Sequence, residues 1–319
     1  MTKMSKRKRT VTTLMIFAFL GTCCILPSAC MYGGIIFPRY EWERNETGVT
    51  ITTVYNWRRH VVIPDTLGGY PVTQIGPTEV DRFTIVFARS QRMAISDFAP
   101  LAPRIPINYR AAGAQNIESI RLPETVTHIG VGAFRDLGNL ESIYLHEGIV
   151  SIGEQAFARC ISLEMVSIPS TVTFIGESAF DQCVNLREVV LPLNLTEVSN
   201  NLFTRNFSLE RVVIPYGVTS IGRGAFSDAI SLKEIEIPYS VTYIGPGAFG
   251  GAISLESITI PPGVTTISSG TFRNATSLRE INYYPTLEYA YWNAFTGTPW
   301  LEEGGFEIMK QQLRDWGEQ

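Results

Sequence analysis

Histidine is scarce in this 319-residue chain, and its scarcity restricts the chemistry that the chain can carry. The three histidines, His60, His128 and His146, belong to no His-Glu-x-x-His motif, phosphate-binding loop or serine-histidine-aspartate set. Carboxylates such as Glu234 and Glu236 are typical of a solvated strand surface rather than of an acid-base pair. We therefore expect no enzyme, cofactor, metal site or small-molecule substrate.

Basic residues are also few once the N-terminus is set aside. The chain has 26 lysines and arginines against 30 acidic residues, and residues 1–29 hold five of the basic residues and no acid. The remaining 21 basic and 30 acidic residues give a net charge of −9. Nucleic-acid binding requires a basic surface, so nucleic acid is an unsuitable partner for this acidic body.

Residues 1–29 have the pattern of a signal peptide, with a basic start followed by the apolar segment Val11–Leu26. Small residues then precede Cys30, which predicts a lipoprotein whose lipid is attached to Cys30 after cleavage. Cys23 is a rival lipidation site, and ordinary cleavage or an uncleaved anchor remain open. A diacylated cysteine would hold the protein stably on a bacterial outer membrane or cell surface. Periplasmic or secreted locations are the alternatives.

The most regular feature of the chain is a phenylalanine that recurs at a constant spacing of 23 residues. The positions are Phe134, Phe157, Phe180, Phe203, Phe226, Phe249, Phe272 and Phe295. A constant period of this length indicates a solenoid, in which each repeat forms one coil stacked on its neighbour. Other positions keep the same period, and the consensus Leu-x-x-Ile-x-Ile-Pro of residues 232–238 predicts a short strand ended by proline.

The rest of each repeat predicts a second extended piece and then a tight turn. Val172–Gly176 is an example of the extended piece, and its glycine is expected to turn the chain with a positive φ. Ala156, Phe157, Cys160 and Leu163 follow at steps of about three, which indicates a short helical or 3₁₀ turn. One coil cannot bury its own apolar edges, so stacking must bury them.

The string Ile-Pro-x-x-Val-Thr-x-Ile-Gly-x-x-Ala-Phe-x-x-Cys-x-x-Leu resembles the BspA-like, or treponemal-type, leucine-rich repeat. Residues 62–76 are similar to that family's usual first repeat, and residues 294–301 to its usual last one. The resemblance implies a mainly β repeat solenoid of 23-residue coils. In it a parallel β-sheet forms the concave face, and short helical or 3₁₀ turns and extended segments form the other side. It also implies a bacterial surface protein that adheres to host or neighbouring-cell macromolecules, with no shared catalytic residues.

Three repeats depart from the family pattern at the glycine position. Ser199 and Ser268 replace the glycine in two of them, and Tyr291 replaces it in the last. We expect these changes to weaken the turn locally.

Two cysteines of the body, Cys160 and Cys183, lie one period apart in a column that is otherwise mostly alanine. Adjacent coils lie within disulfide reach, so one reading is a disulfide bond. The favoured reading is two small buried thiols, because stacked side chains point the same way.

The pattern divides the chain into a signal peptide (1–29), a linker and cap (30–49), a solenoid (50–301) and a capping helix (302–319). We expect residues 41–63 to form a hairpin in which His60–Ile63 returns along Thr50–Tyr55 and covers the first coil.

Two further stretches depart from the regular coil. Residues 77–116 lose the register, either as a degenerate coil marked by Phe87, Ser90 and Met93 or as a proline-rich loop outside the stack. In the final helix, Ile308, Leu313 and Trp316 are expected to cover the last coil.

Outward residues of successive strands would form a grid on which a protein ligand could bind. The grid contains one mixed aromatic, aliphatic and arginine patch, made of Val190, Leu193, Arg211, Val213, Tyr216 and Tyr239. Tyrosine and arginine are favoured at interface centres, whereas valine and tyrosine also simply suit a sheet surface. The predicted function is a lipid-anchored surface protein that binds proteins, in adhesion to host matrix or to other cells. The alternative is an envelope scaffold without a specific ligand.

Overall fold

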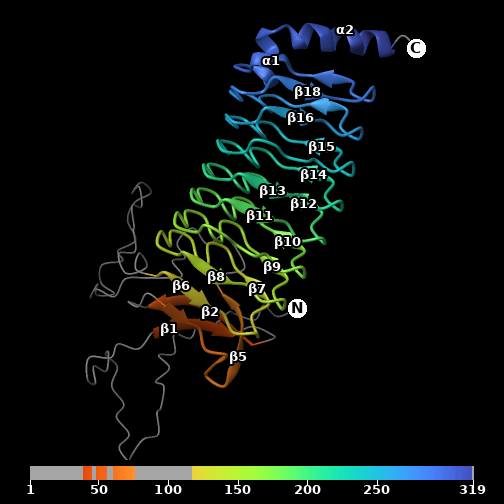
Figure 1. The fold of residues 1–319 in the computed structure, drawn as a ribbon. Helices are drawn as coiled ribbons and strands as arrows, with labels where there is room; N and C mark the ends of the chain where they lie inside the picture. Colours follow the sequence, from red (N-terminus) through yellow and green to blue (C-terminus); the bar gives the residue numbers. More distant parts are fainter. Residues whose placement is uncertain (1–38, 45–47, 56–59, 76–116, 318–319) are drawn as a thin grey trace, which may run out of the picture.

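The computed structural model describes residues 39–44, 48–55, 60–75 and 117–317, which form one elongated stack of coils (Figure 1). The N-terminal strands lie at one end of the stack and the C-terminal helix α2 (Gly305–Gly317) lies at the other. The predicted solenoid of 23-residue coils with parallel sheets is confirmed. The predicted signal peptide, Cys23, Cys30 and the segment 77–116 lie outside the described residues.

The Leu-x-x-Ile-x-Ile segments form the first ladder, in which each central residue is buried and its two neighbours face outward, as in any pleated strand. Its strands are β3 (His60–Val62), β6 (Ser119–Arg121), β8 (Ser142–Tyr144), β11 (Glu188–Val190), β13 (Arg211–Val213), β16 (Ser257–Thr259) and β18 (Glu280–Asn282). The ladder has gaps, because Met165 makes only an isolated bridge to Glu188. Residues 233–237, predicted as a strand, are not assigned to one, although Ile235 and Ile237 are buried.

The second extended pieces form the second ladder, whose two-residue strands from β7 onward each have one buried residue. Its strands are β2 (Val49–Tyr55), β5 (Tyr70–Ile75), β7 (His128–Ile129), β9 (Ser151–Ile152), β10 (Phe174–Ile175), β12 (Glu197–Val198), β14 (Ser220–Ile221), β15 (Tyr243–Ile244), β17 (Thr266–Ile267) and β19 (Tyr289–Ala290). From β7 onward, the strands that pair do so in parallel register one period apart, as Ile221 does with Ile244. In both ladders, a strand that precedes residues 77–116 pairs directly with a strand that follows them, because β3 pairs β6 and β5 pairs β7. The coil of β3 and β5 is therefore the direct neighbour of the coil of β6 and β7.

The hairpin at the N-terminal end is formed by other strands than the sequence predicted for residues 41–63. β1 (Arg39–Arg44) pairs antiparallel with β2, and β3 instead joins the first ladder in parallel with β6. The prediction was wrong because the β-rich segment Thr50–Tyr55 has its antiparallel partner before it in the chain. β2 also pairs β5 in parallel, and β4 (Thr66–Leu67) pairs β5 antiparallel. The β1–β2 hairpin thus covers the open edge of the second ladder, which limits pairing with other chains.

The third side of each coil is a tight turn whose backbone bonds to the next coil. The N–H groups of Gly132, Phe134 and Asp136 donate to carbonyls of the following coil at 2.7 to 2.8 Å. Within the turn, Leu137 and Leu140 donate to residues three positions earlier, which is the 3₁₀ pattern. One regular 3₁₀ helix among the described residues, η3 (Trp292–Phe295), belongs to the last coil. These bonds satisfy backbone groups that stacking would otherwise bury without partners.

Two columns of residues in this turn have a positive φ. The first column is Gly132, Gln155, Ser178, Asn201, Gly224, Gly247 and Gly270, with φ between 53° and 67°. The second column is Asp136, Arg159, Gln182, Arg205, Asp228, Gly251, Asn274 and Gly297, with φ between 57° and 79°. A left-handed conformation costs a non-glycine residue about 1 to 2 kcal/mol. This cost is offset because the left-handed conformation directs the backbone N–H groups of the turn toward carbonyls of the next coil.

The glycine that recurs after the second strand is required for a different reason from the one expected from the sequence. Gly153 and Gly245 do not have a positive φ. A Cβ built on Gly153 would lie 2.7 Å from the carbonyl carbon of Gly130, and one on Gly245 would lie 2.6 Å from the amide nitrogen of Arg223. The prediction of a positive φ was therefore wrong, and glycine is needed because two backbones approach closely.

The serines that replace this glycine form hydrogen bonds to the preceding coil. The Ser268 hydroxyl donates to the carbonyl of Ile244 at 2.9 Å, and Ser199 donates to the carbonyl of Ile175. In the last coil the backbone N–H of Tyr291 donates to the carbonyl of Ile267 at 3.1 Å. Each departure from glycine thus keeps a hydrogen bond between coils.

The phenylalanine column forms the centre of the core, and every ring in it is fully buried. Neighbouring centroids lie 5.1 to 5.9 Å apart, and Trp300 of α1 (Pro299–Glu302) ends the column 4.6 Å from Phe295. Helix α2 covers this end through the buried Met309 and the half-buried Leu313. The expected contact of Ile308 is wrong, since that side chain is exposed. The side chain of Trp316 lies outside the described part.

Candidate functional site

The six residues predicted as a binding patch lie on three adjacent coils and face outward from the first ladder. Val190 pairs with Val213, and Leu193, Tyr216 and Tyr239 follow the Leu-x-x-Ile-x-Ile segments at equivalent positions of their coils. Leu193, Tyr216 and Tyr239 are 76%, 75% and 65% exposed, whereas Val213 is half-buried. We call this set, Val190, Leu193, Arg211, Val213, Tyr216 and Tyr239, the tyrosine patch. The structure brings its members together without any enclosing cavity.

An ion pair fixes the arginine of the tyrosine patch. The Arg211 guanidinium donates to Glu188 Oε1 at 2.8 Å across the paired strands β11 and β13. Both side chains are exposed, so the pair contributes about 0.5 kcal/mol or less to stability. Its effect is to link two neighbouring coils across the tyrosine patch.

Tyr284 extends the tyrosine patch toward the C-terminus, and the sequence patch did not include it. Its ring packs edge-on against Tyr239 at a centroid distance of 6.2 Å, and its hydroxyl donates to the Tyr239 hydroxyl at 3.2 Å. This hydrogen bond raises the pKa of Tyr284. A signal existed in the sequence, because Tyr284 occupies the column that holds proline in most coils.

His146 also occupies that proline column, near the other end of the first ladder. Its ring is buried, its Nδ1 accepts from the Gly148 N–H at 3.0 Å, and Glu124 Oε2 lies 3.3 Å from the same atom. His60 donates to or accepts from the Ser119 hydroxyl at 2.8 Å, and His128 does the same with Thr127 at 2.7 Å. Across the described ranges, no group of three or more His, Cys, Asp or Glu side chains is placed to hold a metal ion.

Cys160 and Cys183 are free, buried thiols, as the favoured interpretation has it. The Cys160 thiol donates to the carbonyl of Phe134 at 3.1 Å, and the Cys183 thiol donates to that of Phe157 at 3.2 Å. Burial raises the pKa of both thiols well above its ordinary value. Both therefore stay protonated and serve packing rather than nucleophilic chemistry.

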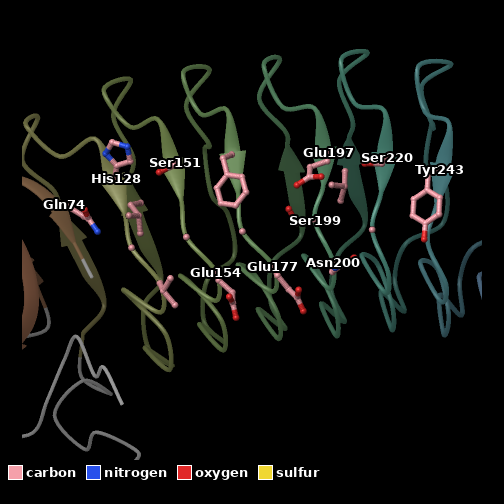
Figure 2. A pocket seen from close by; sticks show the side chains of 18 residues that line it. Gln74, His128, Ser151, Glu154, Glu177, Glu197, Ser199, Asn200, Ser220 and Tyr243 are labelled. Carbon is pink, nitrogen blue, oxygen red and sulfur yellow. The ribbon is translucent and has the colours of Figure 1, made fainter. Parts of the chain in front are cut away.

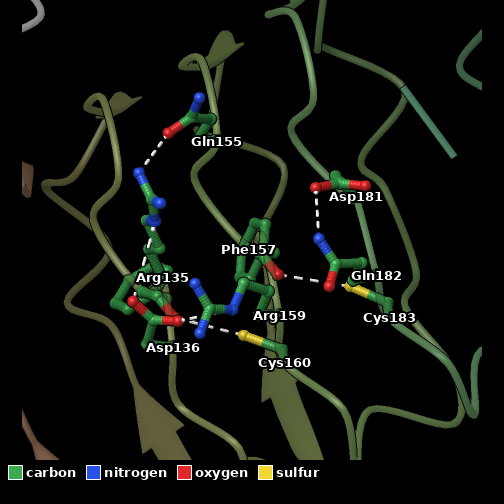
Figure 3. A network of polar contacts seen from close by, with 10 residues as sticks. Arg135, Asp136, Gln155, Phe157, Arg159, Cys160, Asp181, Gln182 and Cys183 are labelled. Carbon is green, nitrogen blue, oxygen red and sulfur yellow. Dashed lines mark hydrogen bonds and ion pairs between the residues drawn. The ribbon is translucent and has the colours of Figure 1, made fainter. Parts of the chain in front are cut away.

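Polar side chains on the outside of the turns link neighbouring coils near these cysteines (Figure 3). Arg159 pairs with Asp136 at 2.9 Å, and Arg135 pairs with Asp136 at 3.6 Å and donates to Gln155. All of these groups are solvent-accessible, so the network adds little stability and forms no enclosed site.

A groove of about 740 Å³ runs along the second ladder, on a different surface from the tyrosine patch (Figure 2). One wall consists of outward residues of the strands, including His128, Phe174 and Tyr243, and the other consists of turn residues such as Glu154 and Glu177. Glycines such as Gly153 and Gly176 lie between the two walls, and the groove is open there because they have no side chains to fill it. Sequence reasoning missed this groove. The sequence did contain an indication of the groove, because the outward residues of the second extended pieces also recur every 23 residues, as His128, Phe174 and Tyr243 show.

Among the described residues, no helix combines the length and apolarity that a membrane crossing requires. No curated protein matches the sequence. A leucine-rich cell surface protein from Faecalibacterium prausnitzii A2-165 is similar in structure, with a TM-score of 0.57 and 24% sequence identity, over 86% of this chain and 76% of that one. A leucine-rich repeat protein of T. pallidum has a TM-score of 0.45 and 19% identity, over 86% of this chain and 92% of that one.

The first of these likenesses shows the same fold, in agreement with the stacked coils. In sequence, residues 107–215 and 196–315 match the BspA type leucine-rich repeat region, in six copies. These ranges cover more than half of the chain and coincide with the phenylalanine period. The chain belongs to the BspA type leucine-rich repeat family.

Proposed function

We propose that this protein is a lipid-anchored bacterial surface protein that binds other proteins through the tyrosine patch, in adhesion to host matrix or to other cells. The observation that carries the proposal is the exposure of three large side chains, Leu193, Tyr216 and Tyr239, on consecutive coils. Contiguous exposed apolar side chains with polar surroundings mark interaction surfaces on soluble proteins.

The chemistry of the patch is that of an interface centre. Tyrosine and arginine carry much of the binding energy in protein complexes, since each offers apolar area together with a hydrogen-bonding group. Tyr239 and Tyr284 support each other's rings, so less side-chain freedom is lost when a partner binds. The stacked backbone provides a rigid support for the whole surface.

The proposed anchor is a lipid on Cys30, with Cys23 as the alternative. The family membership and the similar cell surface protein of Faecalibacterium prausnitzii support an exposed location for this chain as well. Two acyl chains suffice for stable membrane attachment without a transmembrane helix. The anchor would leave the coils free to present the tyrosine patch.

The test measures binding of purified full-length protein to an immobilised basement-membrane matrix. Replacing Arg211, Tyr216 and Tyr239 together by alanine should reduce binding at least about tenfold, because truncating one hot-spot side chain costs about 2 kcal/mol or more. The melting temperature should stay unchanged, because all three side chains are exposed. A matched control replaces Tyr243 and Tyr289 on the second ladder by alanine and should bind normally.

Two binding results would overturn the assignment to the tyrosine patch, and protease resistance would overturn the surface location. Unchanged binding by the triple variant would remove the tyrosine patch as the site, and loss of binding by the control variant would move the site to the second ladder. Added protease should digest the protein on intact cells if it is surface-exposed. Resistance to protease would instead favour an envelope scaffold.

A further inference from the structure

The groove on the second ladder has a shape that fits a single extended strand of polypeptide. It follows the stack from the coil of Gln74 to the coil of Tyr243, and it stays open to solvent along its length (Figure 2). Stacked coils are spaced at about 5 Å and an extended chain rises about 3.3 Å per residue, so roughly nine residues would fill it.

Three consecutive coils each contribute one carboxylate to the groove. Glu154 and Glu177 come from the turn wall, and Glu197 comes from strand β12 on the opposite wall. No ion pair involves any of these three carboxylates in the part of the chain that the structure describes, although Glu177 accepts a hydrogen bond from Asn201 at 3.3 Å. Arg223 follows Glu177 in the turn column two coils later, but it does not line the groove. The centre of the groove is therefore acidic.

Two aromatic side chains on the strand wall line the same groove as these carboxylates. Phe174 lies on β10, in the same coil as Glu177. Its apolar ring is 49% exposed. Tyr243, 51% exposed, marks the C-terminal part of the groove on β15. A ring beside a carboxylate is a suitable environment for a lysine or arginine side chain, whose methylene stem packs on the ring while its charge meets the carboxylate.

We propose that this groove binds an extended basic peptide segment of a partner protein, running along the stack with lysine or arginine side chains at Glu154, Glu177 and Glu197. Charge complementarity identifies the occupant, since the walls carry unpaired negative charge and the chain after residue 29 has a net charge of −9. Basic side chains on one face of an extended peptide recur at about 7 Å, which flexible lysines can match to coils about 5 Å apart. The site is separate from the tyrosine patch.

The test uses full-length protein and a fluorescein-labelled nonapeptide of alternating lysine and valine, followed by fluorescence anisotropy. The wild-type protein should bind the peptide, and binding should weaken as salt increases. The nonapeptide of alternating glutamate and valine should not bind. Replacing Glu154, Glu177 and Glu197 by glutamine should weaken binding of the lysine peptide at least about tenfold, as expected for the loss of three partly exposed ion pairs.

A matched variant separates a built site from general attraction to an acidic protein. Replacing Glu234, Glu236 and Glu280 by glutamine removes the same charge from the first ladder and should leave the affinity within about twofold. Phe174→Ala should weaken binding about fivefold if the ring packs on the peptide. The groove proposal is wrong if the wild-type protein fails to bind at millimolar peptide, or if both glutamine variants lose affinity equally.

These outcomes are independent of the proposed adhesive function. Variants of the tyrosine patch should bind the lysine peptide normally, and the Glu154, Glu177 and Glu197 variant should bind the basement-membrane matrix normally. A negative result for one of the two proposed binding surfaces would therefore not contradict the proposal for the other.

Discussion

The rings of Phe157 and Phe180 lie almost parallel, with centroids 5.1 Å apart and planes inclined by 3°. They come from equivalent positions of neighbouring coils, and each is fully buried. Repeating this contact along the stack produces a core that grows with the number of coils. The stability of each coil therefore depends mainly on its two neighbours.

Removing one ring of the column should open a cavity that the neighbours cannot fill. Phe180→Ala should lower the free energy of unfolding by about 4 kcal/mol. The matched control is Phe174→Ala in the same coil, whose half-exposed ring should cost about 0.5 kcal/mol or less. Urea unfolding followed by circular dichroism measures both, and equal losses would contradict the assignment of the two rings to core and surface.

Two glycines separated by one residue should respond differently to alanine. A Cβ at Gly245 would lie 2.6 Å from the backbone nitrogen of Arg223, whereas one at Gly247 would meet nothing within 4 Å but would sit at a φ of 65°. Gly245→Ala should destabilise the protein by about 3 kcal/mol, because backbone atoms must move. Gly247→Ala should cost about 1 kcal/mol, the penalty of the left-handed conformation. A reversed order in thermal unfolding would show that close approach of the coils is not the constraint.

The buried thiols predict a loss of stability in alkaline solution. Burial raises the pKa of Cys160 and Cys183 in the folded protein, so ionisation of these thiols favours the unfolded state. Their contribution is complete below the ordinary thiol pKa of about 9. It then declines as pH rises further, by at most about 1.4 kcal/mol per pH unit and thiol. Replacing both by alanine, the residue in later coils of the column, should make the decline between pH 8.5 and 10.5 shallower. An identical slope in urea unfolding would contradict this.

Lipidation at Cys30 predicts a change in partitioning. Full-length protein expressed in its bacterial host should enter the detergent phase on Triton X-114 separation, because two acyl chains confer stable hydrophobic association. Cys30→Ser should move it to the aqueous phase, while Cys23→Ser should have no effect. If only Cys23→Ser moves the protein, the lipid is on Cys23, and if neither does, the anchor is not a lipidated cysteine.

Much of the architecture could be predicted because it depends on residues that repeat. The phenylalanine column and the buried isoleucines specify which side chains face the core, and the period specifies the stacking. The positive φ values of Arg159 and Gln182 could not be predicted, because these residue types carry no individual signal for that conformation. The role of Gly153 was misassigned for a related reason, since close approach of another coil is a long-range property.

The candidate sites could be predicted only in part. Strand alternation places Val190 and Arg211 of the tyrosine patch outward, and the column after the proline adds Leu193, Tyr216 and Tyr239. The contact of Tyr239 with Tyr284 spans two coils and needs coordinates to be seen. The groove depends on two columns that are brought together across glycines of the second ladder, and the sequence does not show how far apart such columns lie.

The most direct test of the account places a photo-crosslinking benzoylphenylalanine at Tyr216 of the full-length protein on intact cells, with the same residue at Tyr289 as control. After incubation with a basement-membrane matrix and irradiation, the account predicts crosslinks to a matrix protein from position 216 and none from position 289. Crosslinks from position 289 alone, or none from position 216 while the cells still adhere, would contradict it.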